Sequence, residues 1–396
     1  MSYLTINLVT IEEKIKETIN DTAQWLKDYR DDTTVRVKYL SLVQQCGTDK
    51  QKQTAINDTT EWLDENLDDT TVRTKYLALI GKESELLEDV ESIIARQWQW
   101  MQRRWIENQN KVEQSLLAAF LPVAYHHAKN KELREQIIRF ALKQYSKDSK
   151  NLSIARGLFY FQDYLELKVC YELANFIANF KLPKDKWYYQ VPAANFFRDY
   201  GEFNRAEEIY LKVIKNEKKH KMKGKVSSAS LGYARFLLIK EYSKWNEAVE
   251  YLKPILKENP EHCLANLYMA QCYIVKALSQ DKPTNNSFET VVEFYRKAIR
   301  YDIHKNGKYW YELGNFYKQI MRKKKEAYRC FIESLKQKDN LPACIALAEL
   351  ELEAGNKNDA REYIERGLKI EPITRPEREE KEQLMPKIKS FQQQIN

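Results

Sequence analysis

The sequence repeats itself near its N-terminus, and this repeat limits the possible folds more than any other feature. Residues 19–43 and 56–80 are identical at 16 of 25 aligned positions with an offset of 37, and both contain the segment DDTTVR. A period of about 20 to 50 residues is typical of proteins whose units cannot bury their apolar faces alone and therefore stack. We predict a solenoid of helical hairpins over residues 1–84.

The repeated segment is predicted to form the turn between the two helices of each unit, since apolar residues recur at helical spacing on both sides of it. Asp32 or Thr33 can cap the second helix, because a short side-chain oxygen accepts hydrogen bonds from unpaired amides in the first turn. Gly47 is expected to end that helix, and Thr48 or Asp49 to begin the next one.

The arginine of each copy allows two interpretations. Arg36 and Arg73 occupy equivalent positions in the two units. They could belong to the repeated packing, or they could face a ligand as a pair. The capping residues and the periodic apolar residues around them favour packing.

The composition favours an all-α fold. Only 10 of the 396 residues are Gly and 10 are Pro, so few positions need a left-handed backbone and long stretches lack a helix breaker. No run of apolar residues is long enough to cross a membrane, and the N-terminus lacks the pattern of a secretory signal. The six cysteines form no CxxC pair and are expected to be reduced and mostly buried. We therefore expect a cytoplasmic protein without a membrane span.

A second, more diverged repeat begins near residue 187. Residues 310–317 read WYELGNFY, and Ala327, Phe331 and Ser334 follow in a pattern shifted by one inserted residue. These residues resemble the consensus of the tetratricopeptide repeat (TPR) family, whose units are helix-turn-helix hairpins. Neighbouring segments fit the same consensus, giving five TPR-like units over residues 187–372.

The resemblance implies a right-handed superhelix of stacked helix pairs, possibly in two arrays joined by long helices. Gly314 and Ala360 stand at small-residue positions of the consensus, where a bulky side chain would push the paired helices apart. The N-terminal repeats also resemble those of bacterial signalling and conflict-system proteins.

The remaining segments are predicted to connect and cap the arrays. Residues 85–186 are expected to form a helical connector with diverged repeats, in which the first stretch makes one or two long helices. Trp98, Met101 and Trp105 lie at helical spacing, which is more typical of a core than of a binding surface. Residues 373–396 have the polar character of a capping helix.

No catalytic motif is present. The chain lacks the phosphate-loop, HExxH, GxSxG and GxGxxG patterns. His126 and His127 are adjacent, and neighbouring residues on a helix point about 100° apart, so they make poor joint metal ligands. We predict no enzymatic activity, no metal, no cofactor and no small-molecule substrate.

Positive charge is concentrated after the N-terminal repeats. The net charge is +8, but residues 1–90 carry −7 and the rest therefore +15. Lysines cluster in residues 215–225 and 321–327. Such segments are commonly only solvated, although clustered lysines also attract nucleic-acid phosphates or an acidic protein. The candidate contacts are Lys218, Lys219, Lys221, Lys223, Arg322, Lys323 and Lys324.

The TPR resemblance implies a groove that binds a peptide or a helix of a protein partner. Leu264 and Leu267 stand where a carboxylate-clamp unit would need charge, which argues against a receptor for chaperone tails. Tyr233 and Tyr311 are candidate aromatic anchors. The groove positions of the family fall on Asn195, Arg198, Tyr233, Lys240, Gln271, Lys308, Tyr311, Asn315 and Lys318.

The sequence therefore predicts a non-enzymatic protein-interaction scaffold or adaptor whose partner it does not identify. The alternative is a subunit or regulator of a nucleoprotein or bacterial antiviral-defence complex. In that case the basic C-terminal two-thirds would contact phosphate backbones.

Overall fold

The fold was analysed in a computed structural model. It describes residues 2–66, 69–83, 89–107, 111–219, 228–239, 244–279, 285–302, 305 and 307–395. Within these ranges the regular structure consists of helices, and no strand is present. The prediction of an all-α fold is thus confirmed. None of the helices in these ranges has the length and apolar character needed to cross a membrane.

The chain divides into two compact units, which are considered separately. Unit 1 comprises Met1–Gln162 and Leu167–Phe176, and unit 2 comprises Asp163–Glu166 and Ile177–Asn396.

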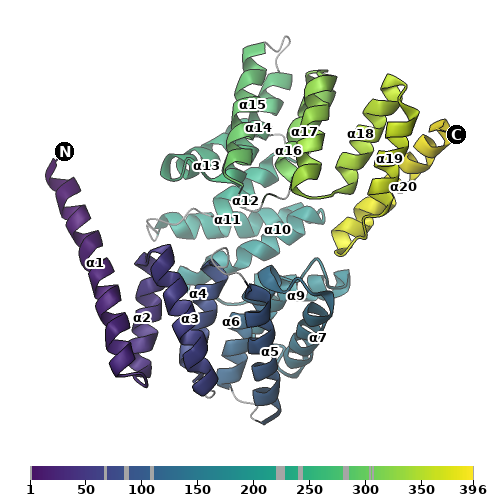
Figure 1. The fold of residues 1–396 in the computed structure, drawn as a ribbon. Coiled ribbons are helices and arrows are strands. Elements are labelled where there is room, and N and C mark those ends of the chain that lie inside the picture. The colour runs from purple at the N-terminus through teal and green to yellow at the C-terminus, as the bar shows by residue number, and fades with distance from the viewer. Residues whose placement is uncertain are drawn as a thin grey trace. The chain divides into compact units, whose positions relative to one another are not determined.

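Unit 1 is a stack of helical hairpins in which α2, α4, α6 and α8 pack on one another in turn. The odd-numbered helices flank this row, as α3 flanks α4 in Figure 1. The helices are α1 (Ser2–Asp28), α2 (Thr33–Cys46), α3 (Asp49–Glu65), α4 (Thr70–Glu83), α5 (Val90–Glu107), α6 (Lys111–His127), α7 (Lys131–Lys147), α8 (Leu152–Phe159) and most of α9 (Leu167–Asn179).

The repeated DDTTVR segment forms the turn that its capping chemistry predicts. Asp32 Oδ1 accepts a hydrogen bond from the amide of Val35 at 2.9 Å. Asp69, its counterpart in the second copy, does the same for Val72 at 2.7 Å. Gly47 follows the last residue of α2, and Thr48 caps α3 with a capping box. These cap predictions are confirmed, with Asp32 and Thr48 as the capping residues.

Arg36 and Arg73 belong to the packing of unit 1. Arg36 is fully buried; its Nη1 donates to Asp58 Oδ2 at 2.6 Å, and its guanidinium lies 4.9 Å from the centre of the Trp62 ring. Arg73 is 2% exposed and lies 4.0 Å from the centre of the Trp100 ring. Burial lowers the pKa of Arg73 to about 10. Each arginine thus joins its helix to the following hairpin, and neither is available to a ligand.

A third arginine repeats part of this arrangement, and the sequence comparison missed it. Asn130 caps α7 by accepting from the Leu133 amide at 3.0 Å. Arg134, four residues after the cap like Arg36 and Arg73, is 6% exposed and donates to the Ala128 carbonyl at 3.1 Å. The flanking sequence has diverged, so only the spacing between cap and arginine could have revealed it.

Within residues 85–128 the described helices are α5 and α6, which agrees with the prediction of one or two long helices in this stretch. Pro122 lies inside α6 without ending it. Trp98 and Met101 are buried, as the core interpretation predicts, whereas the side chain of Trp105 lies outside the described residues. Helices α7, α8 and α9 continue the chain toward unit 2.

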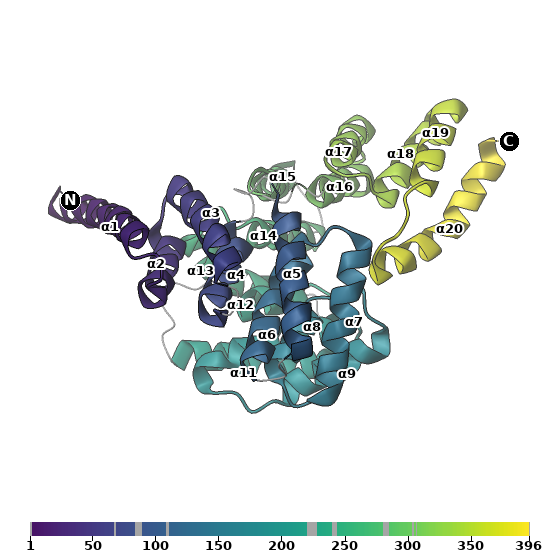
Figure 2. The same ribbon diagram turned by 60° about the horizontal axis from the view of Figure 1, so that its bottom comes forward.

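Over its described residues, unit 2 contains five successive helix pairs and a final helix. Figure 2 shows the later pairs side by side in chain order, followed by α20. A short 3-10 helix at Lys184–Gln190 leads into the pairs. The helices are α10 (Val191–Asp199), α11 (Phe203–Lys219), α12 (Ser228–Leu237), α13 (Trp245–Glu258), α14 (Cys263–Leu278), α15 (Asn285–Arg300), α16 (Lys308–Asn315), α17 (Lys324–Gln337), α18 (Leu341–Ala354), α19 (Lys357–Leu368) and α20 (Arg375–Ile395).

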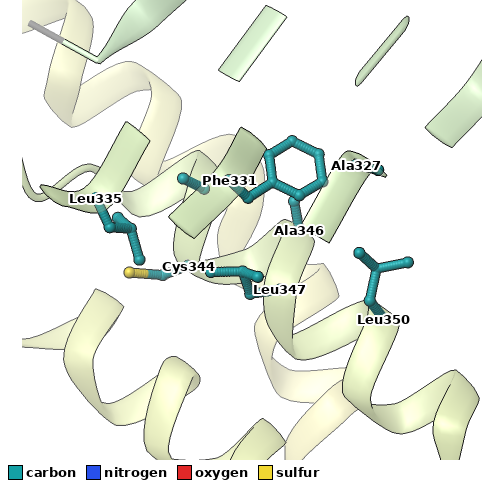
Figure 3. Packing of buried hydrophobic residues seen from close by; sticks show 8 residues of the cluster. Ala327, Phe331, Leu335, Cys344, Ala346, Leu347 and Leu350 are labelled. Atoms are coloured by element: carbon teal, nitrogen blue, oxygen red, sulfur yellow. The ribbon is translucent and has the colours of Figure 1, made fainter. Parts of the chain in front are cut away.

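The TPR-like consensus residues make the expected packing between paired helices. Gly314 of α16 lies against Phe331 of α17, so closely that a Cβ atom at Gly314 would stand 2.5 Å from the ring. Phe331 and Leu335 in turn face Cys344 and Leu347 of α18 (Figure 3). The fold is therefore TPR-like in its local packing as well as in its helix order.

The inserted residue of this unit is accommodated at the end of α16. The helix widens there into a π-helical turn over Phe316–Ile320, and the Met321 amide donates to the Phe316 carbonyl at 3.2 Å. A π-turn holds one residue more than an α-turn. It therefore allows Ala327 and Phe331 of α17 to keep their consensus contacts.

Replacing Gly314 by Leu should destabilise unit 2. The new side chain has no space beside Phe331, and overpacking of this kind costs about 1–3 kcal/mol. We expect a melting temperature several degrees lower. Glu362→Leu, at an exposed position of α19, is the control and should leave the melt nearly unchanged. Equal melting temperatures for the two variants would contradict this packing.

Replacing Arg36 by Ala should destabilise unit 1. The change removes the charged hydrogen bond to Asp58 and the contact with Trp62, a loss of about 1.5–3 kcal/mol for a hydrogen bond to a charged group. Arg30→Ala removes only an exposed ion pair with Glu65 at 3.4 Å and should cost less than about 1 kcal/mol. Urea unfolding compares them, and equal effects would show that Arg36 is not part of the packing.

Candidate functional site

The first helices of the later pairs in unit 2 carry polar side chains that pair with neighbouring helices. We call α10, α12, α14, α16 and α18 the first-helix row. Gln271 of α14 donates to Glu312 of α16 at 3.1 Å. Glu349 of α18 accepts from Lys318, which follows α16, and from Lys387 of α20, both at 2.6 Å. These five residues, the polar ladder, form two groups: Gln271 with Glu312, and Glu349 with Lys318 and Lys387.

The charges of the ladder stabilise one another. Partial burial acts to raise the pKa of Glu349, but the hydrogen bonds from Lys318 and Lys387 outweigh it and hold that pKa below its usual value. The Lys318 side chain is 15% exposed, against 42% for Lys387. The ladder is therefore anchored on its α16 side and open to solvent on its α20 side.

Tyr311 lies beside the ladder on α16. Its ring centre is 5.7 Å from that of Phe331, and burial raises its pKa, although a hydrogen bond with Asn315 acts against this. Lys308 is exposed one turn earlier on the same helix. Five of the predicted groove residues are thus brought together on two neighbouring helices and the turn that follows: Gln271, Lys308, Tyr311, Asn315 and Lys318.

Of three other predicted groove residues, Arg198 and Tyr233 are buried and Asn195 is half-buried. Arg198 is 4% exposed and donates to Asp199, to Asn195 and to the Tyr210 hydroxyl, each at 2.8–3.1 Å. Tyr233 is 2% exposed and its hydroxyl donates to Glu207 at 3.0 Å. These side chains hold α10, α11 and α12 together. They therefore do not form the partner-facing surface that the sequence predicts. The ninth predicted position, Lys240, lies outside the described residues.

The basic segments are only partly described. Lys218 is exposed near the end of α11, whereas Lys221, Lys223 and the side chain of Lys219 lie outside the described residues. Arg322 and Lys323 are exposed in the turn before α17, and Lys324 is exposed as the first residue of that helix. Arg322 adopts a left-handed backbone with φ 57°. Lys324 pairs with Glu353 at 2.8 Å.

His126 and His127 lie at the end of α6 with their ring centres 6.0 Å apart. Burial lowers the pKa of His127, and His126 adds to the effect. Over the ranges that the structure describes, no three side chains of His, Cys, Asp or Glu are arranged to hold a metal ion.

Comparisons with known proteins give similarity of fold only. No protein-family model and no curated protein matches the chain. Among solved structures, TTC0263, a TPR protein of Thermus thermophilus, is 15% identical and covers 53% of this chain and 98% of its own, with a TM-score of 0.40. Human IFIT1, solved as a dimer with PPP-AAAA, is 13% identical over 88% of this chain and 94% of its own, with a TM-score of 0.41. Yeast Tom70 is 12% identical over 98% and 94%, with a TM-score of 0.43.

Replacing Glu349 by Gln should remove a pH-dependent part of the stability of unit 2. Because the folded-state pKa of Glu349 is lowered, its contribution is present above its ordinary pKa and is lost as the pH falls through the folded value. The difference in unfolding free energy between native chain and variant should therefore be larger at pH 7 than at pH 3.

Glu353→Gln is the control, because this carboxylate forms an exposed ion pair with Lys324. Urea unfolding at the two pH values measures both variants. A Glu349→Gln difference that does not change with pH would contradict the ladder.

Proposed function

We propose that this chain is a non-enzymatic scaffold that binds a segment of a protein partner on the first-helix row of unit 2. The observation that carries the proposal is the polar ladder, whose two groups pair α14 with α16, and α18 with Lys318 and α20. Tyr311 lies on α16 between them in the chain order of the helices. Such a surface offers an aromatic contact and fixed charges, a combination suited to recognition.

The contacts divide into two roles. Tyr311 and Asn315 supply the contact area and a hydrogen-bonding group, while Lys308, exposed at the start of α16, attracts acidic side chains. Exposed charges mainly steer association and set orientation, whereas a half-buried aromatic ring contributes more to affinity. The free state of all six cysteines suits the reducing cytoplasm, where we place the protein.

A second candidate function is phosphate binding within a nucleoprotein complex or an antiviral-defence complex. It is favoured by the exposed Arg322, Lys323 and Lys325 in and after the turn before α17. The net charge of +15 beyond residue 90 would add a sequence-independent attraction for nucleic acid.

Replacing Tyr311 by Ala together with Lys308 by Glu should weaken partner capture at least tenfold without changing the helical circular dichroism. The change removes the aromatic contact and reverses the exposed charge. Affinity purification from the native host with quantitative mass spectrometry measures the proteins retained. Lys257→Glu, an exposed charge reversal on α13, is the control and should retain the same proteins as the native chain.

Undiminished capture by the Tyr311→Ala/Lys308→Glu variant would overturn the first proposal. If the native chain also shifts random oligonucleotides at low salt, and Arg322→Glu/Lys323→Glu abolishes that shift, the second candidate replaces it.

A further inference from the structure

Helix α1 has the two residues that hold an arginine in the next hairpin. Asp58 of α3 accepts from Arg36 at 2.6 Å, and the guanidinium lies 4.9 Å from the centre of the Trp62 ring. The repeat offset of 37 places Asp21 and Trp25 of α1 at the positions of these two α3 residues. Residues four apart lie on the same side of a helix. The carboxylate and the indole of α1 are therefore neighbours, as they are in α3.

The second copy of the repeat makes the same kind of contact. Arg73 of α4 donates to Gln97 of α5 at 2.5 Å and lies 4.0 Å from the centre of the Trp100 ring. In both copies a guanidinium meets a side-chain oxygen and a tryptophan face on the next helix of the chain. A guanidinium suits such a place, because it can hydrogen-bond to an oxygen and stack on an aromatic ring at the same time. By the same register, the place on α1 fits an arginine from a helix packed on the side away from α2.

This side of α1 is open. Within unit 1, α1 is the outermost helix and packs on α2 and α3 (Figure 1). Trp25 and Thr22 are half-buried, and Thr18 is exposed. The α3 counterparts of these three residues are at most 1% exposed: Trp62, Thr59 and Ala55. We define the α1 face as the residues that share this side of the helix, namely Thr18, Asp21, Thr22, Trp25 and Tyr29.

The opposite side of α1 is packed as in α3. Ile19 and Leu26 are at most 3% exposed, and their counterparts Ile56 and Leu63 are at most 1% exposed. The two helices thus differ only on the side where α3 receives Arg36 from α2. Because its opposite side is fixed, α1 presents the α1 face without a rearrangement, and a preformed site lowers the cost of binding.

The α1 face and its surroundings attract a positive charge. Tyr29 is 60% exposed, and its ring centre lies 3.8 Å from that of Trp25, so two aromatic rings adjoin the Asp21 carboxylate. Among the residues that the structure describes, no basic side chain pairs with Asp21. Glu17 and Asp28 are exposed along the same side of the helix, with no basic residue between them on that side. The charge and the aromatic rings are complementary to a guanidinium.

We propose that the α1 face binds an arginine-bearing helix of a partner protein, in which the arginine follows an N-capping Asp or Asn by four residues, as in α2. Its guanidinium lies between the Asp21 carboxylate and the Trp25 ring, and apolar residues beside it cover the α1 face. This surface belongs to unit 1 and is separate from the polar ladder, so the inference goes beyond the proposed function.

The helix comes from a different protein because a second folded copy does not offer one. In the described helices, three arginines stand four residues after an Asp or Asn cap, and each is at most 6% exposed: Arg36, Arg73 and Arg134. All three are held by contacts within their own chain.

The test uses the full chain and a fluorescein-labelled peptide of residues 30–45, which carries the cap and the arginine of α2. A side-chain bridge away from the arginine keeps the peptide helical, because isolated short helices are marginal in water. A second peptide carries Arg36→Gln. In the chain, Asp21→Asn should weaken binding of the arginine peptide about tenfold, through loss of a charged hydrogen bond, and should leave binding of the Arg36→Gln peptide unchanged. Fluorescence anisotropy measures all four affinities.

Glu61→Gln is the control, because it removes an exposed carboxylate of α3 and should change the binding of neither peptide. No binding of the arginine peptide to the native chain would overturn the proposal, as would an equal effect of Asp21→Asn on both peptides. Sedimentation of the native chain tests the source of the helix. A dimer that Asp21→Asn abolishes would show that a second copy occupies the α1 face, which contradicts the assignment to a partner protein.

Discussion

The structure depends on one constraint, which is that no hairpin of the chain can bury its apolar face without a neighbour. In unit 2 this is visible at Phe331, which fills the space left by Gly314 on one side and contacts Leu347 of the next pair on the other. The last pair has no sixth pair to cover it, so Ile388 and Phe391 of α20 take that place. The need to cap the array therefore also brings a helix to the edge of the first-helix row.

Local features were predictable from the sequence because they depend on residues a few positions apart. The caps at Asp32 and Thr48 need only a short polar side chain and a free amide in the next turn. The close approach of Gly314 to Phe331 follows from the consensus, which has a small residue in one helix and an aromatic residue in its partner. The two caps and the contact at Gly314 were therefore predictable from the sequence alone.

Contacts between distant helices were not predictable in the same way. Arg198 and Tyr233 occupy partner-facing positions in the family, but Asp199, Tyr210 and Glu207 draw them into the interior. Nothing in the local sequence states which of two neighbouring helices a long side chain will face. The position of Glu380 near Lys308 likewise depends on how far α20 reaches back along the array.

Helix α20 offers the most direct test of the stacking constraint, because Ile388 and Phe391 are buried against the last pair. Native-state hydrogen exchange of an Ile388→Ser/Phe391→Ser variant measures whether α18 and α19 remain stable without this cover, since amide exchange reports local opening. We predict that the amides of α18 and α19 exchange at least tenfold faster in this variant than in the native chain. Unchanged protection of α18 and α19 would contradict the constraint, because the last pair would then be stable without a neighbour.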